Sequence, residues 1–377
     1  MKSIRTTVAT AIIALSAHAA IADIRIGISL PLTGPTSALG IPLKNAIAMW
    51  PTSIGGEKLN VIILDDATDP SQATKNARRF VTEDKVDILM GSAATPPATA
   101  VAVVAAETGT MHITFAPIDV STGKAPWSYN MPQSTLVMSH AIVEHMKKNG
   151  VKTVGFLGYA DAYGELFLRD MKLKMAGTPL KFVSEERFAR TDTSVTGQAL
   201  KVTSGAPDAI LIVASGSGAA MPHKALIERG YKGRIYQTHG AASRDLMRVG
   251  GKDVEGAFVV AGPGMVAEQL QANHPSRKVA MAHVEAWEKI YGPDTRNPFA
   301  GHAYDASILL QRIIPVALKT AKPGTADFRA ALKAALENAG PIPLFHGIVN
   351  YTATNHAGYT DETGVIMRIT NGNWKLQ

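Results

Sequence analysis

The sequence predicts an α/β protein made of two doubly wound lobes, each a parallel sheet covered by helices. Short apolar segments rich in β-branched residues alternate with longer segments of helical periodicity, and this series occurs twice along the chain. A length of 377 residues suits about two domains. Apolar residues make up 46% of the chain and cysteine is absent, so we expect two hydrophobic cores without disulfides.

The first 22 residues have the features of a secretory signal peptide. Lys2 and Arg5 make the start positive, an apolar run follows over residues 8–17, and Ala20-Ile21-Ala22 fits the small-residue pattern of a cleavage site. The apolar run is shorter than the roughly 18 residues of a membrane-spanning helix. We therefore expect cleavage after Ala22 and export of a chain that begins at Asp23.

The exported chain is expected to be free in the periplasm. A lipid anchor needs a cysteine at the new amino terminus, and this chain has none. Loss of Lys2 and Arg5 with the leader lowers the formal charge from +7 to +5, and no cluster of basic residues is interleaved with aromatic ones. We therefore expect no nucleic-acid partner.

The first series of elements begins directly after the leader. Each expected strand is a short buried run, and each loop contains glycine or proline, such as residues 31–35, or an Asp69-Pro70 helix start. Strands are expected at 24–30, 61–64, 86–90 and 111–115, and helices up to Met49, at 72–84 and at 96–107.

The second series begins after residues 127–131. Two of its expected helices end at Gly150 and Gly230, as helices often do. Strands are expected at 153–157, 181–188, 209–214, 234–237 and 257–260, and helices at 136–149, 165–175 and 219–229.

The end of the chain breaks the alternation of strand and helix. Three long helical stretches are expected at 278–290, 304–320 and 327–338, followed by late strands at 348–351 and 365–370. We expect the late helices to pack on the first lobe and the late strands to join the second. The chain would then cross between the lobes several times.

Signatures of enzymes are missing. The chain lacks cysteine chemistry, a Gly-x-Ser-x-Gly turn and a phosphate-binding Gly-Lys-Ser/Thr motif. His140 and His145 are five residues apart, so they point in different directions on a helix and cannot chelate together. We therefore expect no catalytic residue, no metal site and no cofactor. A secreted hydrolase would have to use Ser215 or Ser217 in the loop after the strand at 209–214.

The loop from Gly91 to Pro97 is the strongest candidate for a ligand site. It leaves a buried strand at its carboxyl end and enters a helix, with Thr95 expected at the N-cap and Pro96 at the first helical position. Ligands of doubly wound sheets bind at this edge, and helix amino termini favour anions. A carboxylate would be held by the Thr95 hydroxyl and the amides of Ala94, Thr95 and Ala98. The alternative is a helix cap that faces water.

Several short motifs, in their order and spacing, make the chain from Asp23 to Gln377 resemble a known family. That family is the periplasmic leucine/isoleucine/valine-binding proteins of ABC importers. The motifs are Ile26–Pro35, Gly40, Asn45-Ala46, Asp65-Asp66, Asp69-Pro70, Gly91–Thr95, Tyr163-Gly164, Ala225–Lys232 and Ala303–Ala306.

The resemblance implies a type I periplasmic binding protein, with two lobes joined by a hinge of three strands. The implied N-terminal lobe is 23–140 plus 275–347, and the implied C-terminal lobe is 141–274 plus 348–377. Such a protein closes on a small solute and delivers it to a permease in the inner membrane without transforming it. We expect a monomer.

The resemblance also implies the ligand-binding residues. The family's ligand-holding loops, and two positions that contact the ligand side chain, fall on Ala93, Ala94, Thr95, Ala116, Pro117, Ile118, Tyr163, Ser215, His239, Leu39 and Phe299.

Two positions depart from the amino-acid binders. His239 stands where those proteins hold the ligand ammonium with an acidic residue, and Ile118 stands where they place a hydroxyl. An ammonium would lose a charge-assisted bond, so we expect an aromatic carboxylate or 2-oxo acid instead. The alternatives are a branched-chain amino-acid binder, a sensing module not coupled to transport, and a His239 that faces solvent.

Overall fold

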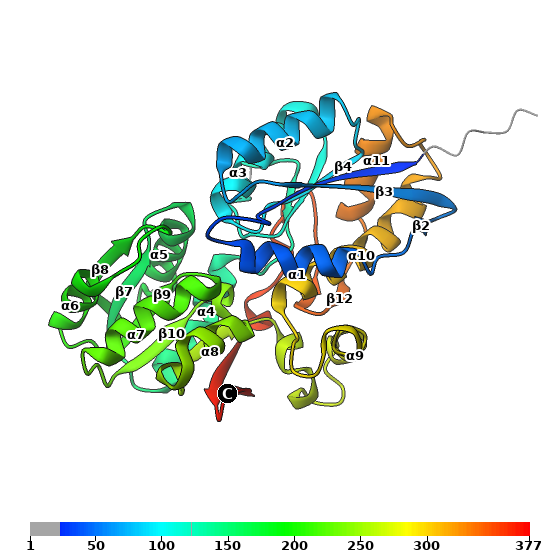
Figure 1. The fold of residues 1–377 in the computed structure, drawn as a ribbon. Coiled ribbons are helices and arrows are strands. Elements are labelled where there is room, and N and C mark those ends of the chain that lie inside the picture. The colour runs from blue at the N-terminus through cyan, green and yellow to red at the C-terminus, as the bar shows by residue number, and fades with distance from the viewer. Residues whose placement is uncertain (1–22, 122) are drawn as a thin grey trace, which may run out of the picture.

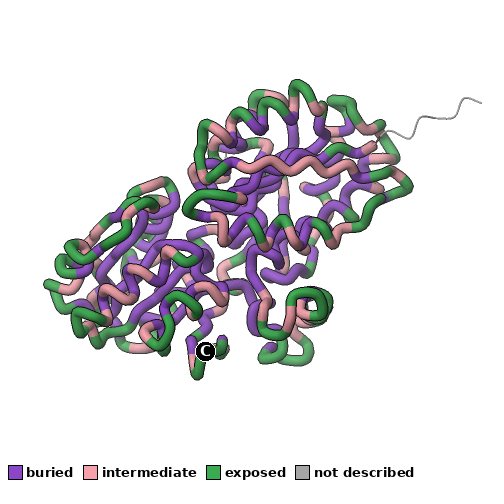
Figure 2. The backbone as a smooth tube through the Cα atoms, in the orientation of Figure 1, coloured by how far each residue is buried: buried purple, intermediate pink, exposed green. Residues whose placement is uncertain are grey.

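A computed structural model describes residues 23–121 and 123–377, and the expected signal peptide lies outside them. Two lobes lie side by side, each with a sheet between helices (Figure 1). The predicted α/β class with two lobes is thus confirmed. In both lobes the central strands are buried and the outer faces of the helices are exposed (Figure 2).

The first lobe contains a six-stranded sheet in the order β2-β3-β1-β4-β5-β6. All its pairings are parallel except the β2–β3 hairpin. Helix α1 packs against α10 and helix α2 against α3. The strands are β1 Ile24–Leu30, β2 Ser53–Ile54, β3 Glu57–Asp65, β4 Ile88–Gly91, β5 Met111–Thr114 and β6 Ser128–Asn130, and the helices are α1 Ser37–Ile47, α2 Pro70–Thr82, α3 Thr95–Thr108, α10 Pro298–Ala317 and α11 Ala326–Glu337.

The second lobe contains a seven-stranded sheet in the order β15-β14-β11-β10-β9-β7-β8. Strands β14 and β15 are antiparallel to their neighbours, so this sheet is mixed rather than wholly parallel. The strands are β7 Thr153–Tyr159, β8 Lys181–Phe188, β9 Ala209–Val213, β10 Arg234–Gln237, β11 Phe258–Ala261, β14 Val365–Thr370 and β15 Asn373–Leu376. The α-helices are α4 Thr135–Lys148, α5 Ala162–Met175, α6 Thr196–Ser204, α7 Ala220–Glu228 and α8 Arg244–Gly250, and the short 3₁₀ helices are η1 Gly216–Ala219, η2 His239–Ala241, η3 Gly251–Val254 and η5 Asp361–Thr363.

The chain passes between the lobes three times. It crosses between β6 and α4, again between β11 and α10 through η4 (Pro263–Gln269) and α9 (Arg277–Tyr291), and finally between β13 and β14. Gln133 in the first crossing ties it to the third, because its Nε2 donates to the carbonyls of His346 (3.1 Å) and Thr363 (2.7 Å).

One late strand does not join the second sheet as expected. Strand β13 (Gly347–Val349) pairs instead with β12 (Ile342–Leu344) in a separate two-stranded sheet. The reason is packing, since Leu344, Val349 and Tyr351 are buried in the core of the first lobe. The expectation for residues 365–370 is confirmed, because β14 pairs with β11.

Two of the three lobe boundaries implied by the resemblance fall inside regular elements. Residue 140 lies within α4, which packs as a whole against α5 and the second sheet, and residue 347 opens β13. We propose boundaries in the crossings instead, at residues 131–134 and 350–364. In the described part of the chain, no helix combines the length and the apolar character needed to cross a membrane.

Candidate functional site

A small cavity lies between the lobes, at the carboxyl ends of the central strands. In the first sheet β1 lies between β3 and β4, and in the second β7 lies between β8 and β9. At this point the loops after two neighbouring strands run to opposite faces of the sheet. The space between these loops forms a crevice for a ligand. Both lobes present such a crevice to the same space.

The cavity gathers the sequence-predicted site residues, with Ile118 the one exception. Arg190 and Gly240 line it too, and the sequence analysis missed both. The lining residues are Leu39, Ala93, Ala94, Thr95, Ala116, Pro117, Tyr163, Arg190, Ser215, His239, Gly240 and Phe299.

Thr95 differs from its expected role as an N-cap. Helix α3 begins at Thr95 itself, Ala94 precedes it, and no side chain caps the helix. The Thr95 hydroxyl donates to the Pro117 carbonyl at 2.9 Å, which joins two loops of the first lobe. The Ala98 amide donates to the Ala94 carbonyl at 2.9 Å. The Ala94 amide donates to Ser92 Oγ at 3.5 Å. Three of the four donors expected to hold a carboxylate on this wall therefore already have acceptors.

Ile118, one of the ligand-binding residues implied by the resemblance, does not line this cavity. Its amide donates to Asn130 Oδ1 at 3.2 Å, and its carbonyl accepts from Asn130 Nδ2 at 3.0 Å. These bonds hold the residue in a neighbouring groove between α3 and α5. The asparagine, which the sequence analysis did not consider, fixes the direction of this loop.

Tyr163 forms part of the opposite wall, at the start of α5. The Asp161 side chain accepts the amides of Tyr163 (2.9 Å) and Gly164 (3.3 Å), and so begins the helix at this position. The Tyr163 hydroxyl donates to Thr238 Oγ1 at 2.7 Å. Because the hydroxyl is held there, the position of the ring in the cavity wall is fixed.

His239 lies in η2, after the carboxyl end of β10, and does not face solvent. The side chain is buried, with 7% of the residue exposed. Burial, and the nearby His346, lower the pKa of His239 to about 3. The imidazole is therefore neutral at pH 7 and carries one N–H donor and one lone pair.

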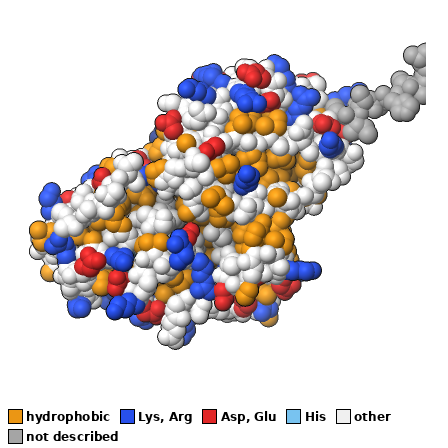
Figure 3. All heavy atoms as spheres, in the orientation of Figure 1, with side chains coloured by type: hydrophobic (Ala, Val, Ile, Leu, Met, Phe, Trp, Pro, Cys, Tyr) orange, Lys and Arg blue, Asp and Glu red, His pale blue; other side chains and the backbone are white. Residues whose placement is uncertain are grey.

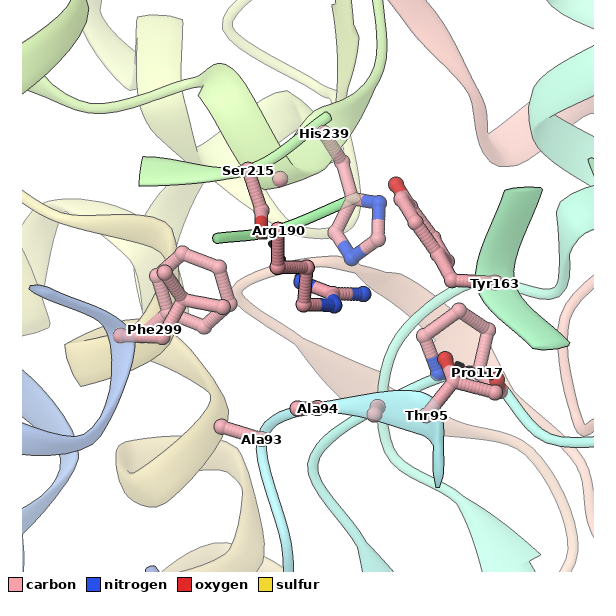
Figure 4. A pocket seen from close by; sticks show the side chains of 12 residues that line it. Ala93, Ala94, Thr95, Pro117, Tyr163, Arg190, Ser215, His239 and Phe299 are labelled. Atoms are coloured by element: carbon pink, nitrogen blue, oxygen red, sulfur yellow. Dashed lines mark hydrogen bonds between the residues drawn. The ribbon is translucent and has the colours of Figure 1, made fainter. Parts of the chain in front are cut away.

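Arg190 places a guanidinium in the cavity. Figure 4 shows it between Phe299 and Tyr163, facing the loop of Ala93 and Ala94 on the other lobe. Its Nε donates to Asp161 Oδ2 at 2.6 Å, and its Nη1 donates to Ser215 Oγ at 3.1 Å. The group also lies 4.1 Å from the centroid of the Tyr159 ring. Only 12% of the Arg190 side chain is exposed, so the charge is held in one place.

The sequence contains a signal for Arg190 that was not used. The residue follows β8 by two positions, at the same sheet edge as the other ligand loops. The rule that ligands bind beyond the carboxyl ends of strands applies to this strand as well.

Apolar side chains close the remaining sides of the cavity. Leu39 comes from α1 and Phe299 from the start of α10, where the Phe299 amide donates to Asn297 Oδ1 at 2.8 Å. The lobes touch beside Leu39, because a Cβ on Gly216 would lie 3.1 Å from Leu39 Cδ1. Gly216 has φ +56°, so glycine suits both the backbone and the close approach.

A family model described as a periplasmic binding protein matches residues 23–373. The chain belongs to this family of periplasmic binding proteins. Among curated relatives, the Leu/Ile/Val-binding protein homolog 3 of Brucella melitensis is 22% identical over 354 residues, covering 90% of this chain and 89% of the relative.

Solved structures of other binding proteins have the same fold. An extracellular ligand-binding receptor from Rhodopseudomonas palustris HaA2 is 48% identical, with a TM-score of 0.92 and coverage of 94% of this chain and 99% of the other. An ABC-transporter solute-binding protein from R. palustris, solved in complex with benzoate, is 19% identical, with a TM-score of 0.79 and coverage of 94% and 95%.

Periplasmic binding proteins bind solutes rather than transform them, and the site of this chain has the same character. In the described residues no hydrogen bond joins Ser215 Oγ to a histidine, and its recorded partner is Arg190. A serine nucleophile needs a base within hydrogen-bond reach.

Proposed function

We propose that this chain is the periplasmic substrate-binding protein of an ABC importer and that it closes on a small organic acid. The ligand class is an aromatic carboxylate or a 2-oxo acid. Arg190 is the observation on which the proposal depends, because its guanidinium lines the cavity, and its Nη hydrogens that are not used by Ser215 can donate to a carboxylate.

The side chains that line the cavity disfavour an amino acid. Among the described residues, the cavity lining contains the basic Arg190 and no acidic side chain. The ammonium group of leucine would therefore enter without a counter-charge. The missing charge-assisted bond is worth roughly 1.5–3 kcal/mol. A ligand with one negative group and no positive group avoids this cost.

The remaining surface of the cavity suits an apolar ligand body. Leu39, Phe299 and the ring of Tyr163 supply apolar contact, and the neutral His239 supplies one polar group. The benzoate complex described above demonstrates that the fold accommodates an aromatic carboxylate. A hydroxyl or 2-oxo oxygen on the ligand would find a partner in His239.

A second candidate, a branched-chain amino acid, is favoured by the names of the curated relatives. A thermal-shift panel separates the two. It contains leucine, phenylalanine, benzoate and an aryl 2-oxo acid, and the protein is first unfolded and refolded to remove ligands that copurify. We expect the acids without an ammonium group to raise the melting temperature. If leucine alone raises it, the proposed ligand class is wrong.

A further inference from the structure

Three buried side chains behind the ligand cavity have not been assigned a role. His302 and Asp305 are one turn apart on α10, and His346 lies in the turn between β12 and β13. Their exposed fractions are 1%, 0% and 3%. The cluster is separate from the ligand cavity, because none of the three residues lines it, and it lies where the third crossing meets the first lobe.

The geometry points to a binding site for a divalent transition-metal ion of the zinc class, with one ligand atom each from His302, Asp305 and His346. Imidazole and carboxylate together form a ligand set that Zn²⁺, Co²⁺ and Ni²⁺ accept. The candidate ligand atoms of the three residues all lie within 4.8 Å of one another.

Two of the candidate ligand atoms are already hydrogen-bonded to each other. His346 Nδ1 and Asp305 Oδ2 are 2.8 Å apart. Two ligands with bonds of about 2.0–2.2 Å lie roughly 2.8–3.1 Å apart on an octahedral ion and roughly 3.3–3.6 Å apart on a tetrahedral ion, so these two atoms would move apart around a tetrahedral ion. A metal ion would therefore replace the proton that these two atoms share. The amides of Phe345 (2.7 Å) and His346 (3.2 Å) also donate to Asp305, which fixes the carboxylate.

His302 provides the independent second observation. Within residues 23–121 and 123–377, neither of its ring nitrogens has a hydrogen-bond partner, although the side chain is almost fully buried. Unsatisfied buried polar groups are costly, so such groups are usually paired. Its ring stacks on His346 with centroids 3.7 Å apart and an angle of 18° between the ring planes, so binding of a shared ion requires the His302 ring to rotate out of this stack.

The sequence analysis expected no metal site, because it tested the cysteine count and the pair His140 and His145 only. The candidate ligands here come from a helix and from a turn about forty residues further along the chain, and local spacing does not connect them.

The test uses Co²⁺ as the probe, on the untagged protein after treatment with EDTA and without organic ligand. We expect one Co²⁺ per chain by calorimetry, with visible d–d absorption. His302→Gln should weaken Co²⁺ binding about tenfold or more, whereas His140→Gln, which removes a more exposed histidine, should leave it unchanged.

Anomalous scattering from crystals of the wild type soaked in Co²⁺ keeps the proposal testable if His302→Gln fails to fold. A peak between His302, Asp305 and His346 is expected. Absence of Co²⁺ binding, equal binding by His302→Gln and wild type, or a peak only elsewhere would each overturn the proposal. None of these results bears on the organic ligand, because the metal is measured without it.

Discussion

Arg190 and Thr95 occupy opposite walls of the cavity, and their hydrogen bonds give them different parts in ligand binding. The Arg190 guanidinium is held by Asp161 and Ser215 and still lines the cavity. The Thr95 hydroxyl hydrogen is used by the Pro117 carbonyl. We therefore assign the carboxylate to Arg190 and a supporting role to Thr95.

Replacement of Arg190 tests this assignment. Arg190→Gln should weaken binding of the best acid of the panel by about 1.5–3 kcal/mol, because a charge-assisted bond to the carboxylate is lost. Calorimetry measures the affinity. The matched control is Arg187→Gln, since Arg187 lies near the end of β8, three residues before Arg190, and is exposed and paired with Glu165. Equal affinity of Arg190→Gln and wild type would contradict the assignment.

Replacement of Thr95 should mainly affect stability. Thr95→Val removes the donor to the buried Pro117 carbonyl, and we expect the free energy of unfolding to fall by about 1–3 kcal/mol. The loss of affinity should be smaller than that of Arg190→Gln. Urea unfolding and calorimetry on both variants check this order. If Thr95→Val instead lost more affinity than Arg190→Gln, the carboxylate would have to be assigned to Thr95 on the first lobe.

The buried His112 ring should make the free energy of unfolding depend on pH. The ring is fully buried, and burial lowers the pKa of His112 to about 4. Its Nε2 faces the Gly91 carbonyl, an acceptor, so Nε2 carries the proton and Nδ1 accepts from Ser128 Oγ at 2.9 Å. The unfolded chain binds this proton with a pKa near 6.5. The stability that the neutral His112 ring contributes is therefore fully present above about pH 6.5 and is lost as the pH falls towards 4.

The contribution of His112 should be about 2 kcal/mol smaller at pH 5 than at pH 7.5. Urea unfolding of wild type and His112→Gln at both pH values isolates it, because other groups titrate equally in the two proteins. The difference in unfolding free energy between wild type and His112→Gln should be smaller at pH 5 than at pH 7.5. A difference that is independent of pH would show that His112 does not titrate in this way.

Most of the cavity lining could be predicted from the sequence, because the residues follow predicted strands and match the family's motifs. Ala93, Tyr163, Ser215 and His239 are of this kind. Arg190 follows an edge strand and belongs to no motif. The directions of the Ile118 and Thr95 side chains depend on partners that are distant in sequence or in another loop.

Helices and strands with complete local signals were predicted well. The bounds of β1, β8, β10 and β14 match their predicted ranges, because each is an extended run between turn residues. Helix α10 begins at Pro298, six residues before the prediction, although Asn297 and Pro298 form a standard helix start. The partner of β13 could not be predicted, because pairing within the chain depends on tertiary packing.

Gly216, in the 3₁₀ helix η1, lies where the two lobes touch. Gly216→Ala should lower the free energy of unfolding by about 1–2 kcal/mol, because alanine is strained at this positive φ. The added methyl group should also push Leu39 away across the cavity. Gly177→Ala is the matched control, because Gly177 has φ +76° with nothing within 4 Å of its Cβ position. Both variants should lose similar stability, but only Gly216→Ala should lose affinity. Equal affinities would show that closure does not depend on this contact.

Contacts between the lobes surround the cavity, which gives the molecule a way to couple binding to closure. Besides the contact of Leu39 with η1, Arg169 on α5 and Asp119 after β5 form an ion pair of 2.9 Å. On the face shown in Figure 3, basic and acidic side chains are interspersed over both lobes. A ligand that contacts both lobes only when they are closed favours the closed form by that difference in contact energy.

Each lobe is built from segments that are distant in the chain, because the chain crosses between the lobes three times. Neither lobe is a continuous stretch of chain, since β14 and β15 return to the second sheet after α10 and α11 have completed the first lobe. The periodicity of a segment shows its type and its buried face. It does not show which lobe the segment joins, because both lobes offer similar apolar surfaces.

Calorimetry with the best acid of the panel and with the amide of that acid tests the central claim most directly. The amide has nearly the same shape without the charge. We predict that wild type prefers the acid by at least about tenfold and that Arg190→Gln binds the two compounds with similar affinity. Equal affinity of wild type for acid and amide, or an unchanged preference in Arg190→Gln, would contradict the claim that this cavity recognises a carboxylate through its guanidinium.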